Sequence, residues 1–278
     1  MIWKTKNRLF NLRSHAVVMG ILNVTDDSFS DGGMFSSVDA AVDHALAMES
    51  AGAEIIDIGG ESTRPGSLPV PVELELRRVL PVVEKLAGRL KAAISIDTSK
   101  AAVARACIER GAEIINDVTA MRGDPAMPQI AAETGAGVVL MHMKGTPRDM
   151  QLAPHYSNVV AEVRDFFRQT WQDTLRSGVD PMSIAFDPGI GFGKTAAHNL
   201  ALLRELQELR IEDRPLVLGV SRKSFISKAL GISNSEDRLW GTVALTSLGR
   251  EYGARVFRVH DVKPNLEALQ MTEAILGA

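Results

Sequence analysis

Short apolar segments rich in β-branched residues recur along the chain at regular intervals. They lie at residues 17–23, 54–59, 92–97, 113–118, 137–142, 183–187, 215–221 and 254–260. Most of them are apolar on successive residues and not on alternate ones, which is typical of strands covered on both faces in a parallel sheet. Parallel strands need crossover connections, so the pattern also predicts helices between them.

The segments between these strands have the apolar spacing of helices. In residues 38–48 the apolar side chains recur with a helical period, and Gly52 follows where a left-handed helix end is expected. Further helices are predicted at residues 71–90, 100–110, 157–177, 196–210, 237–250 and 263–276. A helix end, a glycine and a strand follow one another three times, in SAGAEIIDIGG, ERGAEIINDVT and EYGARVFRVHD. This order indicates a repeated supersecondary unit.

Eight strands alternating with roughly eight helices over about 250 residues have the size and order of a (β/α)8 TIM barrel, a fold of the α/β class. The alternative is an open doubly wound sheet. The segment after the first strand, GILNVTDDSFSDGG, lacks the GxGxxG pattern of a dinucleotide fold, which favours the barrel. We expect one domain over residues 1–278, with residues 1–15 as a short additional N-terminal segment.

The composition is that of a folded protein with small partners. Of the 278 residues 45% are hydrophobic, which excludes general disorder. A formal net charge of −3 and a pI of about 6.1 give no long-range attraction to nucleic acid or to an anionic membrane. A single cysteine excludes a disulfide framework, and no apolar segment reaches spanning length. We expect an intracellular protein that binds small molecules and neither nucleic acid nor membrane.

Polar residues gather where the predicted strands end. They are Asn23, Asp57, Asp97, Asn116, His142, Asp187, Ser221, Arg222, Lys223, Arg258 and His260. Singly, the aspartates could cap helices, His142 could be a satisfied barrel histidine, and Arg222 and Lys223 could be solvated loop charges. Together they indicate a site, because an unpaired buried carboxylate costs several kcal/mol and the strand ends of a barrel converge on one mouth.

The types of these residues restrict the chemical classes of ligand that the site can bind. The acceptors Asp57, Asp97, Asn116 and Asp187 suit either a divalent cation or a flat heterocycle that presents several N–H donors. Cations reach the same face, namely Arg64, Arg222, Lys223, Arg258 and His260. Arg258 and His260 are two residues apart on a strand and should project to one side, where we expect an anion such as phosphate, with Asn23 as a neutral helper. The site should therefore bind a nitrogenous ring at one end and a phosphate at the other.

Two long segments that directly follow strands are expected to act as mobile lids. Residues 25–35 are rich in Asp, Ser and Gly, and residues 59–71 contain three prolines and three glycines around Thr63 and Arg64. Each is longer than a minimal connection between a strand and a helix. Plain surface loops are the alternative, but lids that close over a site can exclude water from it.

These segments closely resemble the dihydropteroate synthase family over nearly the whole chain. The matching words are MGILNVTDDSFSDGG, DIGGESTRPG, SIDTSK, IINDV, LMHMKGTP, DPGIGFGK, GVSRKS and RVHDV. The resemblance implies a cytoplasmic folate-pathway enzyme on a (β/α)8 barrel, usually a homodimer. Its reaction would join 6-hydroxymethyl-7,8-dihydropterin pyrophosphate to p-aminobenzoate with release of pyrophosphate, with Mg²⁺ as the cofactor.

The resemblance also implies roles for individual residues. The pterin would be held by Asp97, Asn116, Met141, Asp187, Phe192 and Lys223. The pyrophosphate would be held by Asn23, Arg64, Arg258 and His260, with Asn23 also near Mg²⁺. The p-aminobenzoate pocket would contain Phe29, Pro65, Lys223 and Ser224. The residues expected to act in catalysis are Thr63, Arg64, Asp97, Lys223 and Arg258.

One departure from the family pattern is Asp26, which stands where the first loop usually has proline. Losing this proline should raise the cost of ordering the loop by about 0.5 to 1 kcal/mol. Its carboxylate could instead touch Mg²⁺ or repel p-aminobenzoate.

Three alternatives to the synthase remain: a pterin-dependent methyltransferase, an aldolase-like enzyme with a Schiff base on Lys223, and a non-catalytic pterin carrier. The ESTRPG and SRKS segments favour the synthase, because a methyltransferase does not need them.

Overall fold

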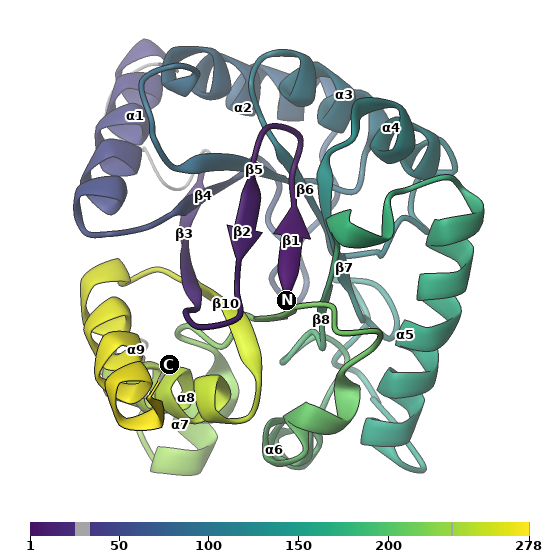
Figure 1. The fold of residues 1–278 in the computed structure, drawn as a ribbon, viewed down its shortest axis with the longest axis vertical. Helices are drawn as coiled ribbons and strands as arrows, with labels where there is room; N and C mark the ends of the chain where they lie inside the picture. Colours follow the sequence, from purple (N-terminus) through teal and green to yellow (C-terminus); the bar gives the residue numbers. More distant parts are fainter. Residues whose placement is uncertain (26–33, 235, 278) are drawn as a thin grey trace.

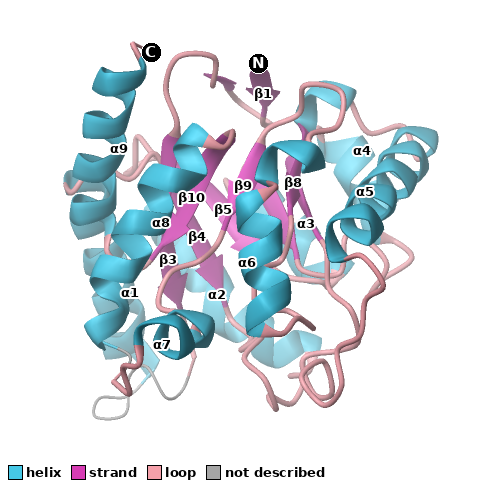
Figure 2. Cartoon of the chain, turned by 90° about the horizontal axis from the view of Figure 1, so that it is seen from below, coloured by secondary structure: helices cyan, strands magenta, loops and turns pink. Residues whose placement is uncertain are grey.

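The structure is a computed structural model that describes residues 1–25, 34–234 and 236–277. Within these residues, eight parallel strands form a closed barrel surrounded by helices (Figures 1 and 2). The strands are β3 (Val17–Asn23), β4 (Ile55–Gly59), β5 (Ala93–Asp97), β6 (Ile114–Asp117), β7 (Gly137–Met141), β8 (Ile184–Asp187), β9 (Leu216–Leu218) and β10 (Ala254–Val259). Each strand pairs with the next one along the chain, and β10 pairs with β3 to close the ring. The predicted (β/α)8 barrel is confirmed.

The helices of the described residues lie outside the strands. They are α1 (Met34–Ser50), α2 (Val72–Leu86), α3 (Ala101–Glu109), α4 (Met127–Thr134), α5 (Val159–Arg176), α6 (Ala196–Arg204), α7 (Ser224–Leu230), α8 (Leu239–Glu251) and α9 (Val262–Leu276). The predicted helix at 196–210 is divided into α6 and a 3-10 turn at Leu206–Leu209. The short helices α4 and α7 were not predicted.

The N-terminal segment forms an antiparallel hairpin of β1 (Ile2–Lys4) and β2 (Leu9–Asn11). The buried side chains Trp3, Phe10 and Leu12 pack against inward-facing residues from every barrel strand. The indole nitrogen of Trp3 donates to the carbonyl oxygen of Ser183 at 2.9 Å, just before β8. The hairpin lies across the amino-terminal end of the barrel (Figure 1), so the segment expected as an addition closes that end.

The strands are buried on both faces, which explains their continuous apolar sequence. In β4, Ile55 packs in the cluster inside the barrel, whereas Ile56 packs in the larger cluster between the strands and the helices. That outer cluster also contains Cys107 of α3, which is fully buried. Burial raises the pKa of the Cys107 thiol to about 12, so this thiol is not ionised near neutral pH.

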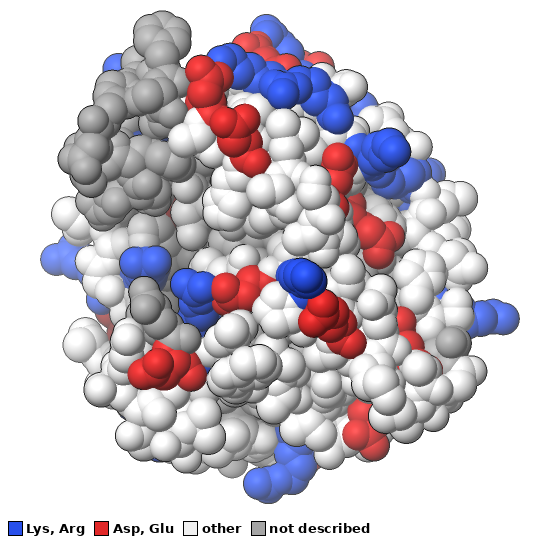
Figure 3. Space-filling model, turned by 90° about the vertical axis from the view of Figure 1, so that its left-hand side faces the viewer, with Lys and Arg blue, Asp and Glu red and all other residues white. Residues whose placement is uncertain are grey.

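No helix among the described residues is long and apolar enough to cross a membrane. On the face shown in Figure 3, lysine and arginine side chains lie among aspartate and glutamate side chains, as expected from the small net charge.

Candidate active site

The polar residues predicted at the strand ends meet at the carboxyl-terminal mouth of the barrel. Asp97 of β5 lies beside Asn116 of β6 in the sheet register, and Met141 of β7 lies beside Asp187 of β8. The Asn116 amide nitrogen donates to Asp57 Oδ2 at 2.9 Å. All of these side chains are buried. The structure therefore brings the predicted acceptors together on a carboxylate-rich floor.

Arg258 of β10 reaches across this floor to two carboxylates. Its Nε lies 2.6 Å from Asp57 Oδ2, and its Nη2 lies 2.7 Å from Asp97 Oδ2. Burial alone would lower the pKa of Arg258, but the carboxylates of Asp57 and Asp97 raise it, so the guanidinium stays charged. This differs from the expected division into an acidic ring end and a cationic phosphate end. Two buried carboxylates need a cation beside them, and Arg258 supplies it.

The Asp97 carboxyl is harder to ionise than an ordinary aspartate. Burial raises its pKa to about 7 although Arg258 is beside it, and the nearby charges of Asp57, Glu75 and Asp117 act in the same direction as burial. Asp97 therefore changes its charge near neutral pH. A carboxylate floor with more acids than cations suits a ligand that offers N–H donors or develops positive charge.

Asp187 and Lys223 are two further charged groups of the site that influence each other. Burial raises the pKa of Asp187, and Lys223 opposes this rise. Burial lowers the pKa of Lys223 to about 8, and Asp187 opposes this fall. The Lys223 ammonium donates to the carbonyl oxygen of Ile190 and lies 4.4 Å from the centre of the Phe192 ring. Two residues predicted to hold the ring, Lys223 and Phe192, thus touch each other.

Fewer of the predicted cations are available to a ligand in the structure than the sequence suggested. Burial lowers the pKa of His260 to about 4, and Arg258 adds to this effect, so His260 is neutral near pH 7. Its Nδ1 lies 3.0 Å from the Ser221 hydroxyl. Arg222 forms two hydrogen bonds with Asp261, at 2.9 and 2.6 Å. The expectation that His260 brings a positive charge to this face is therefore wrong, because a buried imidazole beside a guanidinium loses its proton.

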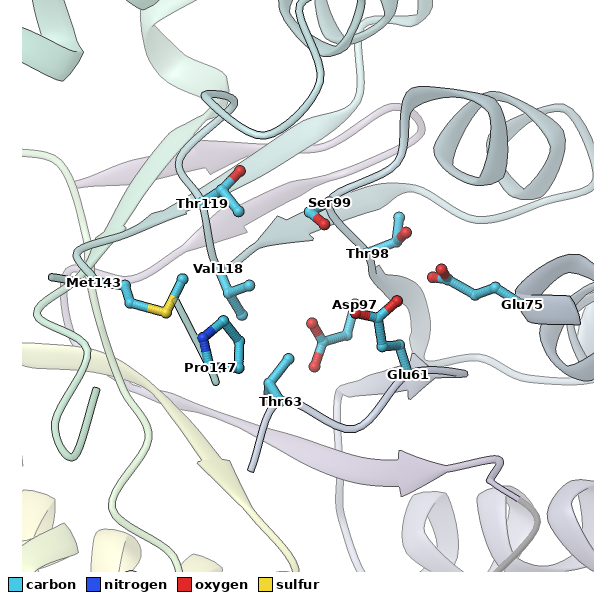
Figure 4. A pocket seen from close by; sticks show the side chains of 10 residues that line it. All are labelled: Glu61, Thr63, Glu75, Asp97, Thr98, Ser99, Val118, Thr119, Met143 and Pro147. Atoms are coloured by element: carbon cyan, nitrogen blue, oxygen red, sulfur yellow. The ribbon is translucent and has the colours of Figure 1, made fainter. Parts of the chain in front are cut away.

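The second loop, residues 59–71, closes one side of a cavity next to Asp97 (Figure 4). Thr63 lines the cavity, whereas Arg64 and Pro65, the next two residues of the loop, are exposed and do not line it. The Gly66 N–H donates to the Pro147 carbonyl oxygen at 2.9 Å, so the loop contacts the connection after β7. Figure 4 shows Thr63 and Pro147 together at the edge of the cavity.

An ion cluster that was not predicted from the sequence holds the base of this loop. The Lys100 ammonium contacts Glu61 of the loop and lies 2.5 Å from Glu75 Oε2 of α2. Glu75 is fully buried, and its other carboxylate oxygen has no hydrogen-bond partner in the structure. Glu61 and Lys100 occur in the segments ESTRPG and SIDTSK. Both segments match the family pattern, which was a signal for these two residues. No spacing in the sequence indicates that Lys100 contacts Glu61.

An apolar wall faces the charged floor. Its residues are Val118, Met141, Met143, Met150 and Phe192. Val118 and Met143 also line the cavity beside Asp97 and appear opposite the acidic side chains in Figure 4. A flat aromatic ligand could rest on this wall while its polar edge meets the carboxylates.

The remaining predicted residues lie at the rim or outside the described residues. Ser224 is exposed at the start of α7, directly after Lys223. Asn23 is exposed at the end of β3. Phe29 and Asp26 lie outside the described residues, so their predicted contacts stay predictions.

The described residues do not form a metal site from side chains alone. Within them, no group of three or more His, Cys, Asp or Glu side chains could hold a metal ion. Asn23 offers a neutral amide oxygen at the mouth. Mg²⁺ commonly binds through one or two protein groups together with substrate phosphates and water. The residues present therefore fit an ion that arrives with a diphosphate.

Comparison with known proteins identifies the class to which this barrel belongs. The family model described as pterin binding enzyme matches residues 19–260. The chain belongs to this family of pterin binding enzymes.

The relatives that it matches define the group within that family. Dihydropteroate synthase of Escherichia coli (strain K12) is 49% identical over 265 residues, which cover 95% of this chain and 93% of that protein. The structure of Xanthomonas albilineans dihydropteroate synthase with 4-aminobenzoic acid is 43% identical, with a TM-score of 0.93 over 100% of this chain and 98% of that one. The complex of the same enzyme with 7,8-dihydropteroate is 41% identical, with a TM-score of 0.90 over 100% of both chains.

Proposed function

We infer that this chain is a dihydropteroate synthase of folate biosynthesis. It joins 6-hydroxymethyl-7,8-dihydropterin pyrophosphate to p-aminobenzoate and releases pyrophosphate. The observation that carries the inference is the buried floor of Asp57, Asp97 and Asn116 around Arg258, in a chain similar to synthases over nearly its full length. The relative from X. albilineans has been solved with 4-aminobenzoic acid and with 7,8-dihydropteroate, which supports both the second substrate and the product.

The pterin ring is proposed to lie between the charged floor and the apolar wall. Asp97 and Asp187 accept hydrogen bonds from its N–H groups, because a carboxylate can accept two parallel bonds from an amidine-like edge. Asn116 donates its amide to Asp57, which leaves its carbonyl oxygen as the acceptor for the ring. Lys223 donates to a ring acceptor, and Met141 and Phe192 contact the ring face.

The reaction is proposed to proceed by dissociative displacement. The bond between the pterin methylene carbon and the diphosphate oxygen breaks, and its electron pair leaves with pyrophosphate. Positive charge on the methylene carbon spreads into the ring, where the carboxylates of Asp97 and Asp187 stabilise it. The aniline nitrogen of p-aminobenzoate then forms the new C–N bond and gives up a proton to water. No covalent bond to the enzyme is needed.

The diphosphate end is proposed to lie at the rim near Asn23, Arg64, Arg258 and His260. The charge of Arg64 adds to the lowering of the pKa of His260, after the larger effects of burial, Arg258 and Arg222. Neutral His260 serves as a hydrogen-bond donor and does not supply charge. Asn23 would hold Mg²⁺ through its amide oxygen. Bound there, Mg²⁺ would supply positive charge that offsets the charge of the departing diphosphate.

The second substrate is proposed to bind after the pterin. Thr63 and Pro65 lie on the second loop, and Lys223 and Ser224 lie at the start of α7. Phe29 would complete this pocket from the first loop. Because the pocket is assembled from loops around an already filled floor, p-aminobenzoate should bind productively only to the pterin complex.

Pyrophosphate release tests the reaction directly. The protein is mixed with the pterin pyrophosphate and Mg²⁺, and pyrophosphate is followed with and without p-aminobenzoate. Strict dependence on p-aminobenzoate is expected. Release at the same rate without it would contradict the synthase reaction, and binding of the pterin without any release would indicate a carrier.

The chain is also proposed to act in the cytoplasm as a homodimer that pairs through α8 and α9. These two helices pack side by side, with Thr246 bonded to Asn265. Their outer surface exposes Trp240 (73%), Met271 (62%) and Ile275 (74%). These exposed apolar side chains support the homodimer that the family resemblance implies, because apolar surface at an interface is covered by the partner.

Light scattering after size-exclusion chromatography tests the dimer. The wild-type protein should elute with twice the mass of one chain, and Ile275→Glu should elute as a monomer. Leu152→Glu, at a leucine that is still more exposed (84%) and lies outside these two helices, is the control and should remain dimeric. A wild-type monomer, or an Ile275→Glu dimer, would contradict this interface.

A further inference from the structure

Lys194 is a buried lysine that the proposed reaction does not use. Its side chain is almost fully buried near the end of the connection between β8 and α6. Its ammonium lies 2.9 Å from His142 Nδ1, 2.9 Å from the Gly189 carbonyl oxygen and 3.0 Å from the Phe192 carbonyl oxygen. The His142 carbonyl oxygen is a fourth acceptor at 3.3 Å, so the three N–H donors of a protonated lysine all find partners here.

His142 completes this arrangement as a neutral acceptor. Burial and the adjacent Lys194 ammonium hold the pKa of His142 far below its usual range. His142 is therefore neutral, and its Nδ1 is the acceptor when Lys194 is protonated, because an ammonium can only donate. The ring packs edge-on against Phe166 at 4.9 Å. Burial likewise lowers the pKa of Lys194 to about 7, and Lys223 adds to this fall while Asp187 opposes it.

The acceptors of Lys194 belong to two loops whose backbones are in close contact. A Cβ atom at Gly189 would lie 1.9 Å from the His142 carbonyl oxygen, and one at Gly193 would lie 2.2 Å from the Lys144 carbonyl oxygen. Both glycines have left-handed φ angles of 63°. Only glycine permits this approach, and the Lys194 ammonium joins the two loops where they meet.

The opposite side of the 189–193 segment faces the candidate active site. Its carbonyl at Ile190 accepts from Lys223, and its Phe192 ring lies under the same ammonium. Asp187 Oδ1 accepts from the Gly189 N–H at 2.7 Å. Three side chains of the proposed pterin site are therefore attached to a segment that Lys194 holds from behind.

We propose that Lys194, with His142, is a positioning residue for the pterin site. It fixes the 189–193 segment so that Asp187, Phe192 and Lys223 meet the ring in one geometry. This role rests on the proposed function, because it assumes that the ring binds at the floor and wall described above. Lys194 itself does not touch the substrate.

Ligand binding to the full chain tests this role. The variant is Lys194→Met, which keeps much of the side-chain volume and removes the three donors. Its dissociation constants for 6-hydroxymethyl-7,8-dihydropterin and for the pterin pyrophosphate should both rise by about tenfold or more, by the same factor, because both ligands share the ring. The kcat at saturating substrates should change by less than about threefold, since the reacting groups remain.

Two further variants make the result decisive. Lys194→Gln keeps two uncharged N–H donors and should lower pterin affinity by a smaller factor than Lys194→Met does. It is also the test variant if Lys194→Met does not fold. Lys144→Met removes an exposed lysine of the adjacent loop and should leave pterin affinity unchanged.

Unchanged pterin affinity in a folded Lys194 variant would overturn the positioning role while leaving the proposed function intact. A weakening confined to the pyrophosphate form would overturn it as well. If the wild-type chain bound no pterin, the proposed function and this role would both fail.

Discussion

Replacing Asp97 with asparagine removes one negative charge from the floor and keeps the shape of the side chain. The guanidinium of Arg258 remains paired in this variant, because Asp57 lies 2.6 Å from it on the other side. The main loss is the attraction between Asp97 and the cationic pterin. At about 5 Å and an effective dielectric constant of about 20, that attraction is about 3 kcal/mol. Spreading of the charge over the ring reduces it, so kcat/KM should fall about 10- to 100-fold.

The pH dependence gives this prediction a second readout. The pKa of Asp97 is about 7, so its carboxylate form grows as the pH rises through 7, and wild-type kcat/KM should rise with it. The pKa of Lys223 is about 8, so activity should fall again as its charge is lost above that pH. Asp97→Asn should lack the rising limb and keep the falling one. The assay is pyrophosphate release below KM from about pH 6 to about pH 9.

Stability measurements separate this effect from misfolding. The folded protein raises the pKa of Asp97 above its ordinary value, so its ionisation destabilises the folded state as the pH rises from about 4 to about 7. Asp97→Asn should therefore not lower Tm at neutral pH. Asp43→Asn, at an exposed position of α1, is the control for the substitution itself. A wild-type rate in Asp97→Asn, or a rising limb that survives, would refute the assigned role.

Two other substitutions test the floor and the loop beneath it. Arg258→Ala leaves two carboxylates without their cation and should lower the free energy of unfolding by about 3 kcal/mol in urea denaturation; an unchanged midpoint would contradict the buried ion pairs. It should weaken binding of the hydroxymethyl pterin, because Arg258 holds the carboxylates of the floor, and binding of the pterin pyrophosphate still more; equal losses would show that Arg258 does not contact the diphosphate. Gly189→Ala puts a Cβ atom 1.9 Å from the His142 carbonyl oxygen and should lower the free energy of unfolding by more than about 2 kcal/mol. Gly135→Ala, with a similar φ of 65° and no atom within 4 Å of the new Cβ, should lower it by only about 1 kcal/mol, and equal effects would show that backbone strain alone decides the loss.

The barrel strands could be predicted from the sequence because each is covered on both faces and is therefore continuously apolar. The short helices and strands could not be predicted from the sequence. Helices α4 and α7 have eight and seven residues, too few to establish a period of 3.6 residues. The hairpin strands β1 and β2 have three residues each, and only the packing of Trp3 and Phe10 under the barrel shows their purpose.

The candidate site was predictable at the level of which strand ends carry acids and amides. The contact between Arg258 and Asp57 was not, because their strands β10 and β4 are separated by β3 and come within reach only when the barrel closes. The neutral state of His260 also depends on burial, which no local spacing reveals. The ion cluster of Glu61, Glu75 and Lys100 joins three segments in the same way.

The burial of Cys107 has a practical consequence for following the second loop. Because the only thiol of the chain is inaccessible and un-ionised near neutral pH, maleimide dyes should leave it unmodified in the native protein. A cysteine introduced at Leu68, which is 70% exposed on that loop, would then carry a single fluorophore. Ligand-dependent movement of the loop could thus be recorded without first removing a native cysteine.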